Sequence, residues 1–307
     1  MKTDEAVAPV IAAMLVLAVI VTFFAVWNAT AIPSMKAQAE VSHLHDVEDG
    51  MLRFSSDIES AASTPSSMTR SERIPLGGGD ILYSSTKSGG VLAIHNGSLT
   101  MVMDIYNTSG SGNYKKLDNS KFRLANFSYQ PSGNFWQDQG YVWSHGYVNV
   151  TKGTLATPFE FSTMNAVDYN LTDALFSASS VSNASNPAEC TVLVLKGVNI
   201  QTANARGSVS GNGAGTLKLV STTGTEKFFN VTRVNITISN SEQLSRFQDA
   251  MRKSVNGSFN KNIFSPVCGN VVYSDTYSTN NTISLTIASI PNVTVIRQTT
   301  EIVLSAQ

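Results

Sequence analysis

A run without any charged side chain, from Ala6 to Trp27, constrains this chain more than any other feature. As a helix rising about 1.5 Å per residue, the run would be about 33 Å long, enough to cross a hydrocarbon core of about 30 Å. The apolar part of a secretory signal peptide is shorter, about 7–15 residues, and no A-x-A cleavage site follows the run closely. We therefore predict that the mature protein keeps this segment as a helix.

Helical periodicity continues beyond the apolar run, because apolar residues recur at steps of three and four up to about Ala61. They are Leu44, Val47, Met51, Phe54 and Ile58. The opposite face is expected to be polar, with Glu40, Ser42, His45, Glu48, Asp49, Arg53 and Asp57. The predicted rod spans residues 7–61, and its part 7–27 is apolar all round. The apolar face of the second part needs a partner, either the chain's own β domain or helices of other copies.

Residues 62–80 are rich in Pro, Gly and Ser, which predicts a hinge after the helix. Beyond them, in residues 81–307, short alternating or β-branched stretches are separated by turn-forming residues, which is typical of a β-sandwich. The expected strands are 90–95, 98–106, 121–130, 140–151, 191–198, 215–221, 228–239, 270–277, 282–289 and 293–304. One helix is expected among them, from Ser241 to about Val255. The predicted fold class is α+β, a long amino-terminal helix followed by a mainly antiparallel β-sandwich.

The composition indicates an exported domain. With 14% charged residues and a net charge of −1, the chain is neither disordered nor basic enough to bind nucleic acid. It contains twelve Asn-x-Ser/Thr sequons, where chance would give roughly five or six, so we predict glycosylation outside the cell. Asn28 lies too close to the membrane segment to be modified regularly. The predicted sites are Asn96, Asn107, Asn126, Asn149, Asn170, Asn183, Asn230, Asn235, Asn256, Asn280 and Asn292. The alternative is that a polar β-protein accumulates sequons through composition alone.

The two cysteines, Cys190 and Cys268, agree with export, because an oxidising exterior permits a single disulfide. Two buried free thiols are the alternative. No C-x-x-C motif or His/Cys cluster indicates a metal site, and we expect no cofactor.

Few residues have the spacing of a catalytic site. Ser84 to Lys87 match S-x-x-K without the companion motifs of acyl-transfer enzymes, and Gly211 to Gly215 lack the context of a nucleotide loop. His43, His45, His95 and His145 are expected to be solvated or packed rather than metal ligands. We therefore expect that the protein is not an enzyme.

Five aromatic residues between positions 135 and 147 could form a surface that stacks on carbohydrate. They are Phe135, Trp136, Tyr141, Trp143 and Tyr147. Because alternating residues of a strand face one side, Tyr141, Trp143 and Tyr147 are better explained as core.

The stretch "DEAVAPVIAAMLVLAVIVT" resembles the amino terminus of archaeal type IV pilin-like proteins, in which a short charged leader precedes an unbroken apolar helix. The stretches "QAEVSHLHDVEDGMLRFSSDIESA" and "GNFWQDQGYVWSHGYVNVTKG" are similar to archaeal surface proteins with the same leader. The family's usual Ser before the proline is Ala8 here. Ile11 stands where bacterial-type pilins carry a glutamate, so an assembly mechanism based on that acid does not carry over.

The resemblance implies that a prepilin-type peptidase removes leader residues 1–6 by cutting between Ala6 and Val7. The apolar helix would first anchor the precursor in the membrane and later pack in the core of a homopolymeric filament built by pilus assembly machinery. The implied function is a structural subunit of a pilus-like filament at the cell surface. The alternative is a membrane-anchored surface glycoprotein or minor pilin that does not polymerise.

Overall fold

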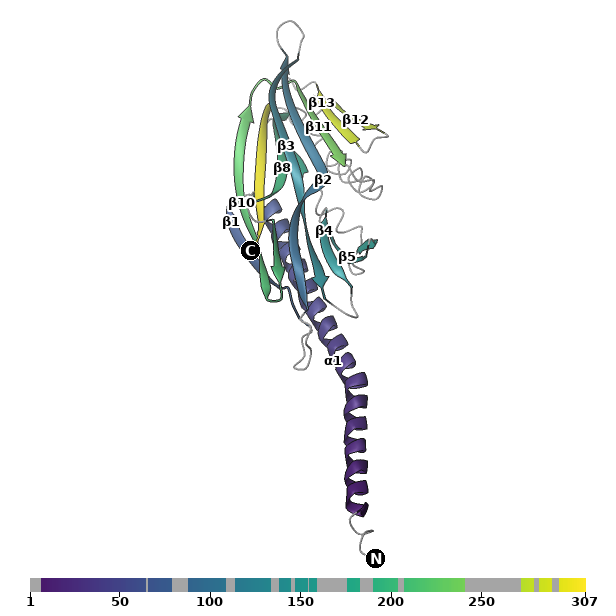
Figure 1. Cartoon of the computed structure of the whole chain (residues 1–307). Coiled ribbons are helices and arrows are strands. Elements are labelled where there is room, and N and C mark those ends of the chain that lie inside the picture. The colour runs from purple at the N-terminus through teal and green to yellow at the C-terminus, as the bar shows by residue number, and fades with distance from the viewer. Residues whose placement is uncertain are drawn as a thin grey trace, which may run out of the picture.

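We describe the protein from a computed structural model. The described residues are 7–64, 66–78, 88–108, 114–133, 138–144, 147–153, 155–158, 176–182, 190–203, 207–240, 272–278, 282–288 and 293–307. The helix expected at Ser241 to Val255 lies outside these ranges. A long helix enters a β domain at one end, and its amino-terminal part projects from the domain as a free rod (Figure 1). The predicted fold class is confirmed.

The helix α1 (Val7–Ser63) agrees with the predicted rod of residues 7–61 and continues through Pro33 without interruption. Every residue from Pro9 to Thr30 is exposed. The second half has a buried stripe that includes Leu44, Val47 and Phe54, as the spacing of apolar residues predicts. The two halves of one helix therefore have opposite environments.

The expected polar face of α1 is wrong at one position. Glu40 is fully buried, and Lys36, one turn earlier on the same face, is 7% exposed. The buried stripe thus begins with two charged residues and becomes apolar only at Leu44. Helix periodicity places Glu40 on the side of Leu44 and Val47, and this geometry prevails over its polarity.

The hinge expected at residues 62–80 is also wrong in part, because it contains strand β1 (Met68–Pro75). This strand pairs antiparallel with β10 (Ala214–Phe228) along its whole length, from Met68 opposite Ser221 to Pro75 opposite Ala214. The chain therefore leaves α1 and returns directly along the edge of a sheet. The helix and the β domain are joined by a paired strand.

The first sheet has five strands in the described residues, in the order β1-β10-β14-β8-β7. Strand β14 (Thr294–Ala306) lies at its centre, antiparallel to β10 and parallel to β8 (Cys190–Thr202). Strand β7 (Phe176–Ser182) closes the other edge. The parallel pair brings the end of the chain beside a strand about one hundred residues earlier.

The second sheet has nine strands in the described part of the chain, with the main order β12-β13-β11-β2-β3-β4-β5-β6. The long strands β2 (Gly89–Thr108) and β3 (Tyr114–Ser132) form its centre, with an irregularity between Asn96 and Thr100. The other members are β4 (Gly140–Ser144), β5 (Tyr147–Lys152), β6 (Leu155–Pro158), β11 (Arg233–Asn240), β12 (Val272–Ser278), β13 (Thr282–Ala288) and β9 (Ser208–Gly211), which pairs with β2.

The sequence locates most of these strands but merges or divides some of them. The expected strands 90–95 and 98–106 are one strand, β2, whereas the expected strand 140–151 is the β4–β5 hairpin. Strands β1, β6, β7 and β9 are not among the expected ones. The glycine-rich residues 211–215 join β9 of the second sheet to β10 of the first, as a connection between strands.

One hydrophobic core unites the helix and both sheets. Phe54 of α1 lies edge-on to Phe127 of β3, with ring centroids 5.2 Å apart, and Phe127 stacks on Trp143 of β4. Ile302 of β14 and Leu217 of β10 belong to the same cluster from the first sheet. The carboxy-terminal half of α1 thus lies against both sheets (Figure 1), and its buried side chains belong to the core.

Candidate functional site

The free half of α1 is the feature that the fold leaves without a partner in the described residues. From residue 9 to residue 30 it exposes thirteen large apolar side chains between Val10 and Trp27, each at least 47% exposed. An 18-residue window within α1 reaches a mean hydropathy of 2.8, so the helix is long and apolar enough to span a membrane. At about 1.5–3 kcal/mol for each large side chain, these thirteen would lose of the order of 20–40 kcal/mol in water relative to burial. The surface therefore requires lipid or protein around it.

One side of this free half carries a run of small side chains. Ala18, Thr22, Ala25 and Ala29 follow one another at steps of four, three and four, which places them in one stripe of the helix. The Thr22 hydroxyl donates to the carbonyl oxygen of Val19 at 2.9 Å, so it needs no outside partner. Small residues in such a stripe allow the backbones of two helices to approach closely.

The opposite side of the free half is bulky. The side chains of Phe23 and Trp27 stack with ring centroids 6.3 Å apart, and both are about half exposed. Aromatic residues near the end of an apolar helix are typical of a membrane–water interface. Between Ala18 and Ala29 the free half is therefore two-sided, with a narrow stripe for close packing and a broad apolar face.

Two consecutive hydrogen bonds anchor α1 near the point where it enters the domain. The Nε2–H of His43 donates to the hydroxyl oxygen of Tyr129 at 2.9 Å, and this hydroxyl donates to the carbonyl oxygen of Leu76 at 3.1 Å. The carbonyl can only accept, which defines the direction of both bonds. Burial lowers the pKa of His43, although the nearby Asp46 carboxylate opposes the shift, and burial raises the pKa of Tyr129. Of the two environments expected for the histidines, solvated or packed, His43 has the packed one.

Two further bonds hold the buried half of α1 against β4. The Tyr141 hydroxyl donates to Oε2 of Glu48 at 3.1 Å, and Nε1–H of Trp143 donates to Oγ of Ser55 at 2.9 Å. Tyr141 and Trp143 are buried, so the core interpretation of these aromatics is confirmed. Phe135 and Trp136 lie outside the described residues, as does the side chain of Tyr147.

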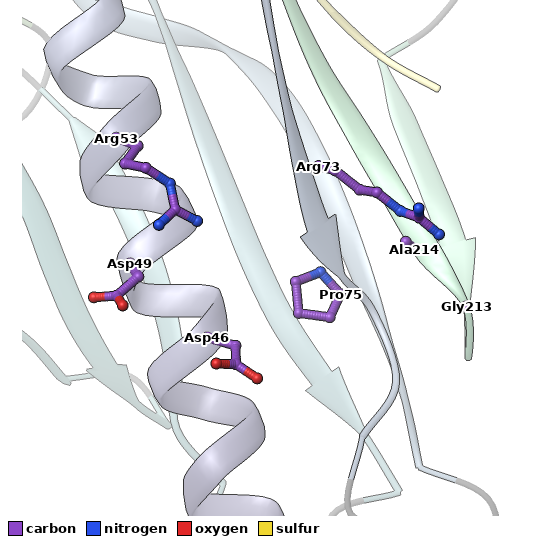
Figure 2. A pocket seen from close by; sticks show the side chains of 7 residues that line it. All are labelled: Asp46, Asp49, Arg53, Arg73, Pro75, Gly213 and Ala214. Carbon is purple, nitrogen blue, oxygen red and sulfur yellow. The ribbon is translucent and has the colours of Figure 1, made fainter.

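A charged groove of about 530 Å³ lies between α1, β1 and the turn before β10 (Figure 2). Asp46, Asp49 and Arg53 line it from the helix, and Arg73 lines it from β1. Arg53 forms an ion pair with Glu72 at 2.8 Å. The two acids and two arginines balance, so the groove offers no strong net charge to a ligand.

A second groove, of about 700 Å³, lies where α1 leaves the domain. It is lined by Ala37, Gln38, Val41, Ser42, Leu44, His45, Glu48, Gln139 and Tyr141. Val41 is 53% exposed there, and Met35, six residues closer to the free half, is 51% exposed. Exposed apolar side chains of α1 therefore extend from the free half as far as this groove.

A polar cleft of about 370 Å³ between strands of both sheets contains Arg297 of β14. The guanidinium forms ion pairs with Asp118 and, at 2.7 Å, with Glu226, and it lies 5.4 Å from the ring centroid of Phe228. These contacts join β14 to β3 and β10. Sequence reasoning does not find this network, since no local pattern marks an arginine whose partners are distant along the chain.

The predicted glycosylation sites have different environments. Asn96 and Asn230 are exposed, whereas Asn107, Asn126, Asn149 and Asn235 are half-buried. Outside the described residues lie Asn170, Asn183, Asn256, Asn280 and Asn292. Asn28 is exposed on the free half of α1.

The remaining candidate residues are not brought into one site. His45 is exposed beside Glu48, and His95 lies 3.3 Å from the hydroxyl of Ser128. His145, Ser84 to Lys87, Ala6 and Cys268 lie outside the described residues, and of Cys190 only the backbone, at the start of β8, is described. The disulfide and the cleavage between Ala6 and Val7 therefore stay predictions. Among the described residues, no group of three or more His, Cys, Asp or Glu side chains could hold a metal ion.

Comparisons of the chain with models of protein families, with curated proteins and with solved structures find no match. The functional assignment therefore rests on the geometry of the free helix and of the surfaces around it.

Proposed function

We propose that this protein is a structural subunit of a pilus-like filament at the cell surface, in which the free halves of α1 from many copies form the core. The main support is the contrast between the two parts of α1. The helix has a buried stripe in its own domain from about Leu44 to Ile58, and it is exposed at every residue from Pro9 to Thr30. A helix that served only its own domain would gain nothing from such a projection. A subunit of a helical bundle requires it.

The two-sided free half supports packing between copies. The stripe of Ala18, Thr22, Ala25 and Ala29 lets one helix approach another, and the satisfied threonine hydroxyl is compatible with a dry interface. The same helix can occupy lipid before assembly, because it is long and apolar enough to span a membrane. Transfer from lipid to a bundle of equivalent helices exchanges one apolar environment for another, so packing and not hydrophobicity drives it.

The amphipathic half of α1 is already covered within its own domain. Leu44, Val47 and Met51 are covered by the chain's own sheets, so they need no second copy. The proposal rests on the free half and on the groove next to it, where Val41 is exposed. A neighbouring helix packed along the rod would reach this groove.

Two substitutions in the free half test the proposal as a matched pair. Ala18→Leu adds the same bulk and hydropathy as Ala12→Leu, but only position 18 lies in the small stripe, since position 12 is on the side of the large residues. We expect Ala18→Leu to remove the protein from sheared surface filaments, whereas Ala12→Leu reduces its amount far less. Immunoblots of sheared and detergent-extracted membrane fractions measure both, and the inserted precursor should be equally abundant in the two variants.

If Ala18→Leu reaches filaments at wild-type abundance, close helix packing is not the basis of assembly. If the wild-type protein occurs only in the detergent-extracted membrane fraction, the filament proposal is wrong. The anchored surface glycoprotein then takes its place, since a spanning helix and an outer domain suffice for it.

A further inference from the structure

The turn between β10 and β11 presents one sequon in a way that the other described sequons do not share. Asn230 is exposed and has a positive φ of 55°, the only such non-glycine residue in the described part of the chain. Asparagine adopts this left-handed conformation more readily than most residues. The side chain therefore stands on a defined turn outside the regular pairing of both sheets.

The residues on either side of Asn230 have opposite environments. Val231 is fully buried, and the amide of Thr232 donates to the carbonyl oxygen of Tyr106 at 2.9 Å, which anchors the turn to β2. Phe229, directly before the asparagine, is 64% exposed. The turn thus holds an asparagine and an aromatic ring in solvent on a fixed base.

This turn lies at the outer end of the molecule. The ends of β10 and β11 that it joins are at the end of the sandwich away from the free rod (Figure 1). With the rod in a membrane or in a filament core, this end faces the surroundings. A bulky group attached there would not meet the helix or its groove.

The five other described sequons of the β domain all place their asparagines within paired strands, at Asn96, Asn107, Asn126, Asn149 and Asn235. Asn149, in the same tripeptide Asn-Val-Thr, uses its Nδ2 to donate to the carbonyl oxygen of Val142 at 3.4 Å and to Oγ of Ser144 at 3.2 Å. The side-chain oxygens of Asn126 and Asn235 are buried. A sugar on Nδ2 removes one of its two hydrogens, so a glycan at Asn149 would cost a hydrogen bond that Asn230 does not have to give up.

Asn96 is exposed, but its surroundings are crowded. It lies in β2 opposite Ala125, and the following Gly97 approaches β3 so closely that an added Cβ would clash with the carbonyl oxygen of Leu124. Its sequon also ends in serine, whereas that of Asn230 ends in threonine.

We propose that Asn230 is the principal N-glycosylation site among the sequons of the described residues and that the exposed ring of Phe229 supports the first sugar. The inference rests on export of the domain, which the proposed function also requires, but not on polymerisation. The apolar face of a sugar ring covers an exposed aromatic ring and removes its surface from water. The glycan would therefore both shield Phe229 and be held by it.

The modification is a transfer from a lipid-linked oligosaccharide. Nδ2 of Asn230 attacks C1 of the first sugar, the bond between C1 and the phosphate oxygen breaks, and the phosphate-bearing lipid leaves with its electron pair. The amide loses one proton, and the second hydrogen stays on the nitrogen.

Two isosteric substitutions test the site, each made in the full-length protein and measured on protein purified from the surface of the cells that naturally produce it. Asn230→Asp keeps the shape and tolerates a positive φ, and Asn149→Asp makes the same change in an identical tripeptide. We expect Asn230→Asp to lower the intact mass of the purified protein by one glycan and Asn149→Asp to leave the mass unchanged. Glycopeptide mapping of the wild type should find the sugar on Asn230 in most copies and on Asn149 in a small minority.

A glycan found equally at both sites, or at Asn149 instead of Asn230, would overturn the assignment, as would a wild-type protein without sugar at Asn230. If filaments contain the protein without a glycan, the glycosylation proposal is wrong and the filament proposal stands. If the protein is glycosylated but occurs only in the membrane, the filament proposal is wrong and the glycosylation proposal stands.

The contribution of Phe229 has a separate readout. The thermal unfolding midpoint should fall when the glycan is removed enzymatically from the wild type, and this fall should be absent in Phe229→Ala. An equal fall in both proteins would show that the ring does not support the sugar.

Discussion

Truncation of Phe54 tests whether the second half of α1 belongs to the β domain. Its side chain is fully buried and lies edge-on to Phe127, which itself stacks on Trp143. Phe→Ala in a core costs about 3–5 kcal/mol, and the upper part of this range applies where the surroundings cannot collapse into the cavity. Both sheets and the helix surround this position, so we expect about 4–5 kcal/mol.

This loss should be large enough to measure directly. A change of 1 kcal/mol shifts the unfolding midpoint by roughly 2–4 °C in domains of about 150–250 residues, so Phe54→Ala should lower it by on the order of 10 °C. The assay is near-ultraviolet circular dichroism of the full chain in detergent micelles during heating, because the stacked tryptophan contributes to that signal.

Two matched variants give the comparison. Leu52 is two residues from Phe54 on α1 and is 38% exposed. Leu52→Ala should therefore lower the free energy of unfolding by less than about 1 kcal/mol. Leu17→Ala, in the free half at 61% exposure, should not move the midpoint of the domain. Equal shifts for Phe54→Ala and Leu52→Ala would refute the reasoning, since the helix would then lie on the domain and not in its core.

Three further results are expected. Ser55→Ala should destabilise the protein by about 1–3 kcal/mol in chemical denaturation, because it leaves the buried Nε1–H of Trp143 without its acceptor; an unchanged midpoint would contradict the hydrogen bond. The pKa of His43 is lowered from 6.5 on folding, so its contribution to stability is full above about pH 6.5 and is lost as the pH falls toward the folded-state pKa; His43→Gln should flatten the stability profile in that window, and parallel profiles would argue against it. Amino-terminal sequencing of surface-extracted protein should begin at Val7, and an intact Met1 would exclude processing.

The sequence predicts α1 well because helical spacing of apolar residues and burial coincide there. Leu44, Val47, Met51, Phe54 and Ile58 form the buried stripe as expected, since steps of three and four leave a single face for the core. The long strands are found for a similar reason, as alternating residues of β2 and β3 face the interior.

Other parts of the fold leave no local signal. Strand β1 reads as a hinge because only Ile74 in Met68–Pro75 is buried, so the edge strand has no alternation to detect. The parallel pairing of β14 with β8 is decided by the whole domain, and no residue of either strand encodes it alone.

The same limit applies to the candidate site. The uncharged run by itself indicates the free helix, because lipid and helix bundles both require an apolar segment of this length. The identical tripeptides at Asn149 and Asn230 cannot be ranked from their letters. Only the fold places one of them in a strand and the other on an exposed turn.

Electron cryo-microscopy of filaments sheared from the cell surface, with their subunits identified by mass spectrometry, tests the central claim most directly. We expect filaments built from this chain, in which neighbouring copies cover residues 9 to 30 and the β domains lie outside. A filament core built without these residues, or the absence of the protein from every filament while it is abundant in the membrane, would contradict the account.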